Sequence, residues 1–161
     1  LKPQNIPTHE VKHASMHIEA LRDAVLAHKA SGRTDLMMLG FGNLAQIKPR
    51  LDFSLGLLSV ASFDIINPNV FDSVETAIHE VASAKPQAVC LCALDEAYPE
   101  LVPALCKGLK ALPQAPVIIL AGYPADKVES YRAEGVDIFI HLRANAFDTL
   151  KDIAIRMGVK A

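Results

Sequence analysis

The residues with the most chemical potential form a glycine-containing segment in the first third of the chain. Gly40-Phe41-Gly42-Asn43-Leu44-Ala45 follows an apolar run typical of a β-strand, and it matches the pattern G-x-G-x-x-A. In dinucleotide-binding proteins such glycines let the backbone approach a pyrophosphate, which lies at the N-terminus of the next helix. Two features argue against that site. Pro49 falls in the second turn of the required helix, and the next predicted strand ends at Asn67 instead of at a ribose-binding acid.

A phospho-acceptor receiver domain is a second interpretation of the same region. It needs an acidic pair after the first strand, an aspartate at the end of the third strand and a lysine after the fifth. Leu39-Gly40 supplies no acid, and Asp95 lies slightly past its strand. His141 and Arg143 stand where the lysine is expected. Without metal ligands, phosphoryl chemistry lacks the cation that neutralises its charge, so the pattern disfavours this class.

Three histidines are spaced four residues apart near the start of the chain. His9, His13 and His17 would share one face of a helix, and two histidines at this spacing can bind a metal together. The pattern places no acidic or thiol ligand beside them. We therefore expect a solvated polar face and no metal site.

Composition narrows the class of protein further. The chain has 161 residues, enough for one domain, and 51% of them are hydrophobic. Its net charge of −2 argues against nucleic acid and against an anionic membrane surface as partners, and no apolar run is long enough to cross a membrane. The odd number of cysteines, Cys90, Cys92 and Cys106, without a Cys-x-x-Cys pair, predicts buried free thiols in a reducing compartment such as the cytoplasm. Because no signal peptide is visible and the chain starts at Leu1, we expect a piece of a longer protein with its own upstream domain.

Hydrophobic periodicity predicts five strands that alternate with helices. The expected strands are Leu36–Leu39, Phe63–Asn67, Ala88–Ala93, Val117–Ala121 and Asp137–Ile140. The expected helices run from about Thr8 to Ala30, from Arg50 to Ala61, from a cap at Asp72 or Ser73 to Pro86, from Pro99 to Leu112, from Pro124 to Glu134, and onward from Ala144 or Asn145. Such alternation predicts a doubly wound, three-layer α/β fold of the flavodoxin-like (Rossmann-like) type, with a parallel sheet in the order 2-1-3-4-5 and an extra N-terminal helix. We divide the chain into a linker and helix, residues 1–33, and an α/β domain, residues 34–161.

Four segments follow predicted strand ends or turns and can be compared with known families: Gly40–Arg50, Asp95–Pro103, Ala121–Val128 and Gly135–His141. On these segments, the sequence from Leu36 onward resembles the cobalamin-binding domain of methylmalonyl-CoA mutase, and in particular the small subunit of the heterodimeric bacterial enzymes. Together with the matching order of elements, these segments extend the resemblance over about four-fifths of the chain.

The resemblance implies a degenerate cofactor site. Catalytic members of that family carry Asp-x-His-x-x-Gly after the first strand; the histidine is the lower ligand of cobalt and the aspartate orients it. The residues of this chain that align with the motif are Leu44, Gln46 and Pro49. The family's usual serine after the third strand aligns with Cys92, and its usual pair of glycines after the fourth strand aligns with Ala121-Gly122. The residues implied for this degenerate cobalamin site are Gly42, Leu44, Gln46, Cys92, Gly122 and His141. None is expected to be catalytic or to bind a metal.

The function implied by the resemblance is structural. The family cofactor is adenosylcobalamin, and without the motif we expect this chain not to bind it. The expected partner is a large catalytic subunit, which converts methylmalonyl-CoA to succinyl-CoA, and this domain would stabilise the heterodimer. Two alternatives stay open: a domain that still binds adenosylcobalamin without a lower-ligand histidine, through His141 and the loop Gly40–Gln46, and a nucleotide-binding regulatory module.

Overall fold

The computed structural model describes the backbone of residues 8–142 and 144–161, and the side chains from Met16 onward apart from those of Asn67 and Pro68. Within these residues, five parallel strands form one sheet: β1 (Asp35–Phe41), β2 (Asp64–Phe71), β3 (Ala88–Cys92), β4 (Val117–Ala121) and β5 (Ile138–Ile140). Their order is β2-β1-β3-β4-β5, which confirms the predicted flavodoxin-like topology.

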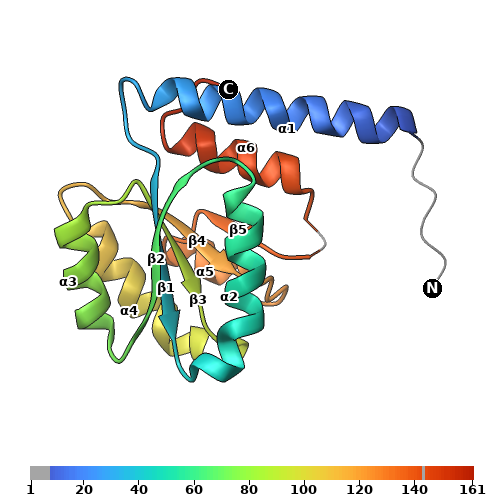
Figure 1. Cartoon of the computed structure of the whole chain (residues 1–161). Helices are drawn as coiled ribbons and strands as arrows, with labels where there is room; N and C mark the ends of the chain where they lie inside the picture. Colours follow the sequence, from blue (N-terminus) through green and yellow to red (C-terminus); the bar gives the residue numbers. More distant parts are fainter. Residues whose placement is uncertain (1–7, 143) are drawn as a thin grey trace, which may run out of the picture.

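Helices cover both faces of the sheet (Figure 1). They are α1 (Thr8–His28), α2 (Leu44–Ser59), α3 (Val74–Ala84), α4 (Tyr98–Lys110), α5 (Val128–Glu134) and α6 (Ala146–Arg156), with a short 3-10 turn, η1 (Asp95–Ala97), before α4. Helices α2 and α6 pack on one face together with side chains from α1, and α3, α4 and α5 pack on the other. No helix of the described part of the chain is long and apolar enough to cross a membrane.

The core consists of two apolar layers that the sheet separates. Alternate residues of β1 point into different layers: Leu36 and Met38 pack with α2 and α6, and Met37 and Leu39 pack with α3 and α4. Successive side chains of a strand point to opposite faces, so a strand buried on both faces has to be apolar throughout. This is why the uninterrupted apolar runs in the sequence predicted the central strands.

The extra N-terminal helix lies along α6 (Figure 1), and its second half joins the core. Leu21 and Val25 are buried against the layer formed by α2 and α6. The predicted boundary between residues 33 and 34 stays a prediction. The expected extended leader, residues 1–7, lies outside the described residues.

Helix α2 starts six residues earlier than predicted. Asn43 has an extended backbone and caps the helix, because its Oδ1 accepts a hydrogen bond from the amide of Ala45 at 2.9 Å. Pro49 therefore lies inside α2, where its ring removes one backbone hydrogen bond. Ala45 and Pro49 are both exposed, so water can reach the carbonyl that loses its partner. The expectation that Pro49 prevents a helix directly after the glycine segment is wrong.

Strand β2 runs four residues beyond its predicted end at Asn67. Met37 pairs with Ile66 whereas Leu39 pairs with Asn69, so β2 carries one extra residue at a bulge. Because β2 is an edge strand, it tolerates a proline that would break a central strand. The predicted strand end at Asn67 is thus wrong, and the residue that follows β2 is Asp72.

Smaller corrections concern the loops at the carboxyl edge of the sheet. Helix α5 begins at Val128, not at Pro124, since Pro124 opens a turn in which its carbonyl accepts from the amide of Lys127 at 2.8 Å. Helix α4 begins at Tyr98, one residue before the predicted start. Ser73 caps α3 and Asn145 caps α6; each is one of the two residues predicted for the start of its helix.

Candidate functional site

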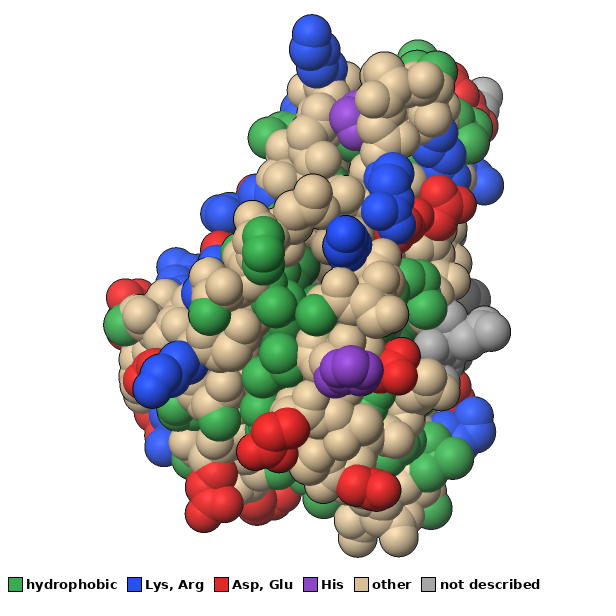
Figure 2. Space-filling model, turned by 90° about the vertical axis from the view of Figure 1, so that its left-hand side faces the viewer, with side chains coloured by type: hydrophobic (Ala, Val, Ile, Leu, Met, Phe, Trp, Pro, Cys, Tyr) green, Lys and Arg blue, Asp and Glu red, His purple; other side chains and the backbone are tan. Residues whose placement is uncertain are grey.

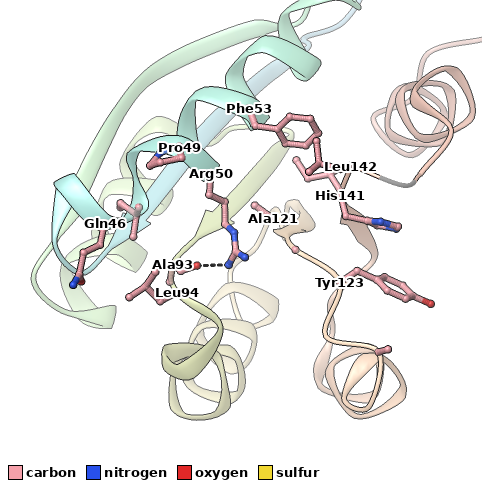
Figure 3. Close-up of a pocket in the computed structure, with 14 residues that line it drawn as sticks. Gln46, Pro49, Arg50, Phe53, Ala93, Leu94, Ala121, Tyr123, His141 and Leu142 are labelled. Carbon is pink, nitrogen blue, oxygen red and sulfur yellow. Dashed lines mark hydrogen bonds between the residues drawn. The ribbon is translucent and has the colours of Figure 1, made fainter. Parts of the chain in front are cut away.

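A pocket of about 920 Å³ lies at the carboxyl edge of the sheet, between α2 and the loops that follow β4 and β5 (Figure 3). This is the edge at which ligands bind in open α/β sheets. The lining is mostly apolar and comes from Gln46, Ile47, Pro49, Arg50, Phe53, Ala93, Leu94, Ala121, Gly122, Tyr123, Ala125, Ile140, His141 and Leu142.

The two glycines of the G-x-G segment have backbone roles. Gly40 lies within β1, and a Cβ there would come within 3.1 Å of the carbonyl oxygen of Asn69. Gly42 has a φ of +106°, which lets the chain leave β1 and enter α2. Neither glycine is among the residues that line the pocket. Packing and chain reversal therefore account for the glycine pattern without a ligand.

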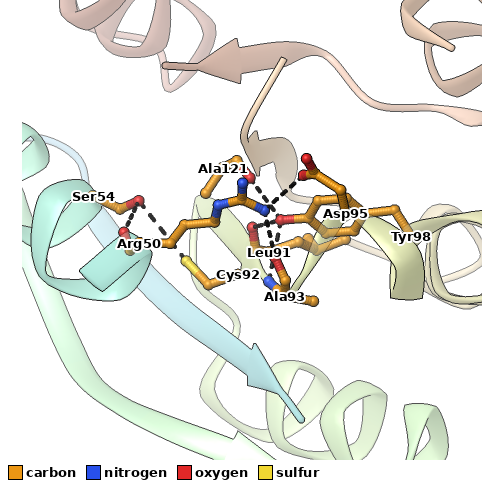
Figure 4. A network of polar contacts seen from close by, with 8 residues as sticks. All are labelled: Arg50, Ser54, Leu91, Cys92, Ala93, Asp95, Tyr98 and Ala121. Carbon is orange, nitrogen blue, oxygen red and sulfur yellow. Dashed lines mark hydrogen bonds and ion pairs between the residues drawn. The ribbon is translucent and has the colours of Figure 1, made fainter. Parts of the chain in front are cut away.

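The Arg50 side chain joins α2 to the end of β3. Its Nη1 donates to the carbonyl oxygen of Ala93 at 2.6 Å and to Oδ1 of Asp95 at 2.8 Å (Figure 4). Since α2 follows β1, this contact crosses the crevice between β1 and β3, where the strand order reverses. Arg50 thus holds the two sides of the topological switch point together.

Beneath Arg50, the buried Tyr98 ties β3 to β4. Its hydroxyl accepts a hydrogen bond from the amide of Ala93 at 3.1 Å and donates to the carbonyl oxygen of Ala121 at 2.6 Å (Figure 4). Burial raises the pKa of the Tyr98 hydroxyl, so it stays protonated. The guanidinium carbon of Arg50 lies 5.9 Å from the centre of the ring. Arg50 and Tyr98 therefore form one network that satisfies polar backbone groups at the strand ends.

All three cysteines are free and buried, as predicted. Cys92 Sγ lies 3.9 Å from the hydroxyl oxygen of Ser54, which itself donates to the carbonyl oxygen of Arg50 at 2.8 Å. Burial raises the pKa of Cys106 to about 11. Within the described residues, no group of three or more histidine, cysteine or acidic side chains could hold a metal ion. Of the three spaced histidines, His9 and His13 have side chains outside the described part, and the His17 ring lies 5.1 Å from that of Phe147.

The structure brings together three of the six residues named for the degenerate cobalamin site. Gln46, Gly122 and His141 line the pocket. Cys92 is buried at the end of β3, and Leu44 is 54% exposed in the first turn of α2; neither contributes to the lining, nor does Gly42. The roles of all six in binding stay predictions.

The residues that shape this site most were not predicted from the sequence. Arg50 and Tyr98 lie inside the segments that carry the family resemblance, but no spacing rule distinguishes them from their neighbours. Tyr123 was also missed; its ring stacks on that of His141 with centroids 4.5 Å apart. The only available signal for Tyr123 was the position of a tyrosine directly after a strand end, and this is a weak indication of a site residue.

Comparison with known proteins connects this fold to a family. The sequence is 32% identical over 143 residues to the methylmalonyl-CoA mutase small subunit of Porphyromonas gingivalis. This chain is related to methylmalonyl-CoA mutase small subunits. The match covers 88% of this chain and 22% of the mutase subunit, so the chain spans about a fifth of that relative's length. No protein-family model matches the sequence.

Solved structures agree with the fold. A cobalamin-binding protein from Desulfitobacterium hafniense superposes with a TM-score of 0.58 at 19% identity, covering 89% of this chain and 70% of that protein. A CheY-like protein, TadZ, from Pseudomonas aeruginosa gives a TM-score of 0.56 at 17% identity, covering 78% and 95%. At these identities the two structures show a shared architecture, and the link to the mutase rests on the sequence match.

Proposed function

We propose that this chain is the cobalamin-binding-like domain of a methylmalonyl-CoA mutase small subunit and that its role is structural. In this proposal it stabilises a cytoplasmic heterodimer with a large catalytic subunit, and the whole enzyme converts methylmalonyl-CoA to succinyl-CoA. The observation that carries the proposal is the 32% identity to a mutase small subunit along 88% of the chain. A role without a cofactor follows from the side chains at the carboxyl edge that could act as ligands of cobalt.

These side chains do not fit cobalamin held by a protein imidazole. No Asp-x-His pair occurs anywhere in the sequence. The aligned residues, Leu44 and Gln46, lie in the first turn of α2, where leucine cannot orient a ligand and an amide is a poor ligand for cobalt. The imidazole in the pocket lining belongs to His141, at the end of β5, and it stacks on Tyr123.

The chain's own side chains keep the crevice in shape without a cofactor. Arg50 bonds to Ala93 and Asp95 across the switch point, and Tyr98 links β3 to β4 below it. Hydrogen bonds that satisfy buried backbone groups make these strand ends rigid. A domain with a self-supported carboxyl edge can offer a constant surface to a partner.

The proposal is tested by titrating the chain with adenosylcobalamin and recording the visible spectrum. We expect the spectrum of the free cofactor at every concentration, because no imidazole replaces the cofactor's own base. Conversion to a protein-ligated, base-off spectrum would overturn the cofactor-free role. A variant that restores the whole motif, Leu44→Asp with Gln46→His and Pro49→Gly, is the matched control for whether the scaffold can take up the cofactor at all.

The first alternative is a domain that binds adenosylcobalamin without a lower-ligand histidine. The size of the pocket favours it, since about 920 Å³ suffices for a large organic group. Its contacts would be His141 and the loop Gly40–Gln46; of these, His141 and Gln46 line the pocket. Equilibrium dialysis separates this case, because base-on binding retains cofactor without changing its spectrum.

The second alternative is a nucleotide-binding regulatory module. Two observations favour it: α2 starts directly behind the glycine segment, and Asp72 follows β2 in place of the missing acid. Against it, neither Gly40 nor Gly42 lines the pocket. A thermal-shift titration with NAD tests the alternative, and a rise in melting temperature that disappears in Asp72→Ala would support it.

A further inference from the structure

We propose that the pocket between α2 and the β4 and β5 loops binds a small organic anion with a flat apolar body, and that Arg50 anchors its anionic group. Neither the assembly role proposed above nor cobalamin is needed for this inference. It rests on the shape, the donors and the charge of the pocket.

The size and the walls of the pocket suit an aromatic body. Its volume of about 920 Å³ lies within the range typical of sites for small organic ligands. Phe53 and Leu142 lie at one end, and the stacked rings of Tyr123 and His141 lie across the pocket from Gln46 (Figure 3). Apolar and aromatic walls favour a flat ring system over a polar chain.

Arg50 supplies an oriented set of donors at the floor of this pocket. A guanidinium carries five N–H groups in a rigid fork, and the two hydrogen bonds of Arg50 both start from Nη1. The edge formed by Nε and Nη2 takes part in neither of these two bonds, although the guanidinium also interacts with the Tyr98 hydroxyl. This edge matches the two oxygens of a carboxylate, phosphate or sulfonate. Since Ala93 and Asp95 fix the guanidinium, a ligand would meet a preorganised donor pair.

The charge balance of the lining also favours an anion. Arg50 is the one permanently charged side chain among the described lining residues, and none of them is acidic. Asp95 forms an ion pair with Nη1 of Arg50, but the Asp95 side chain is not part of the pocket lining. An anion that enters beside Phe53 and Tyr123 therefore meets a cation without meeting a carboxylate in the wall.

Two fluorescent probes that differ by one charged group test the proposal. They are 8-anilino-1-naphthalenesulfonate, a flat anion, and N-phenyl-1-naphthylamine, the same body without the sulfonate. We expect saturable binding of both, with a dissociation constant about tenfold lower for the anion, because hydrogen bonds to charged groups are the stronger kind. Absence of saturable binding, or equal constants for the two probes, would overturn the proposal.

Variants assign the site within the molecule. Arg50→Met should weaken the anion to the level of the neutral probe, whereas Lys48→Met, which removes an exposed cation paired with Asp52 outside the lining, should change neither constant. Ala125→Trp should weaken both probes by filling the pocket. If Arg50→Met does not fold, the Ala125→Trp variant still tests whether the probes bind in this pocket.

A smaller hollow provides the matched control. It measures about 330 Å³ and is lined by residues at α3 and after α4, including Val81, Ala82 and Leu112. On the side of α3, hydrophobic side chains form an interrupted stripe between charged ones (Figure 2), a second surface to which such probes could adhere. Ala82→Trp should leave both constants unchanged. If Ala82→Trp weakens the probes and Ala125→Trp does not, the proposed site is wrong.

Discussion

Replacement of Tyr98 by phenylalanine should destabilise the domain strongly, although Tyr98 lies at the start of a helix next to a loop. The Tyr98 side chain is fully buried, and its hydroxyl serves the amide of Ala93 and the carbonyl of Ala121. Phenylalanine keeps the ring but leaves both backbone groups without that partner. Each unsatisfied buried group costs roughly 1–3 kcal/mol, so we expect the two together to lower the free energy of unfolding by about 2–6 kcal/mol.

The assay is urea unfolding followed by far-ultraviolet circular dichroism, supported by thermal melting. For a domain of this size, each kcal/mol lost should lower the melting temperature by about 2–4 °C. Tyr123→Phe is the matched control, because Tyr123 is 50% exposed and its hydroxyl has no hydrogen bond within the described part of the chain. It should stay within about 0.5 kcal/mol of the parent. A Tyr98→Phe variant as stable as Tyr123→Phe would refute the proposed role of the network.

Three further predictions concern α2, the glycines and the thiols. Asn43→Ala removes the cap of α2 and should cost about 1 kcal/mol by urea unfolding, whereas an unchanged midpoint would contradict a helix start at Leu44. Gly56 lies at an exposed helical position with open space around it, so Gly56→Ala should stabilise the domain by about 0.5–1 kcal/mol in urea unfolding. Gly135 has a φ of +130°, so Gly135→Ala should destabilise the domain by about 1–3 kcal/mol. Changes of the same sign in both variants would contradict the backbone geometry. Iodoacetamide at pH 8 should modify none of the three buried cysteines in the native protein and all three after denaturation, as read by mass spectrometry, and rapid native labelling would show that the thiols are accessible.

The topology could be predicted from the sequence because it depends on patterns that are local. Apolar runs as short as those of β3 and β4 are typical of central strands, and the alternation with helices leaves few arrangements of a parallel sheet. The start of α2 could not be predicted in the same way. Pro49 argued for a late start, but a cap at Asn43 and an exposed helical face outweighed that penalty.

The site was predicted only in part, since it depends on contacts between distant segments. Gln46, Gly122 and His141 were named from the family resemblance. They line one pocket because each follows the end of a strand, and a parallel sheet brings these ends to one edge. Arg50 and Tyr98 act through backbone atoms of Ala93 and Ala121, and no sequence pattern marks a side chain that bonds to a remote carbonyl. The end of β2 was missed for a similar reason, because its bulge exists only in the pairing with β1.

The number of cobalamin molecules in the assembled enzyme tests the proposed structural role most directly. The measurement uses the small subunit that contains this chain, purified together with a large catalytic subunit and saturated with adenosylcobalamin before free cofactor is removed. Bound cofactor is then counted against the mass of the complex. We expect one cobalamin per heterodimer, bound by the large subunit, because the carboxyl edge of this chain is held by Arg50 and Tyr98 and has no imidazole on α2. Two cobalamins per heterodimer would contradict this expectation.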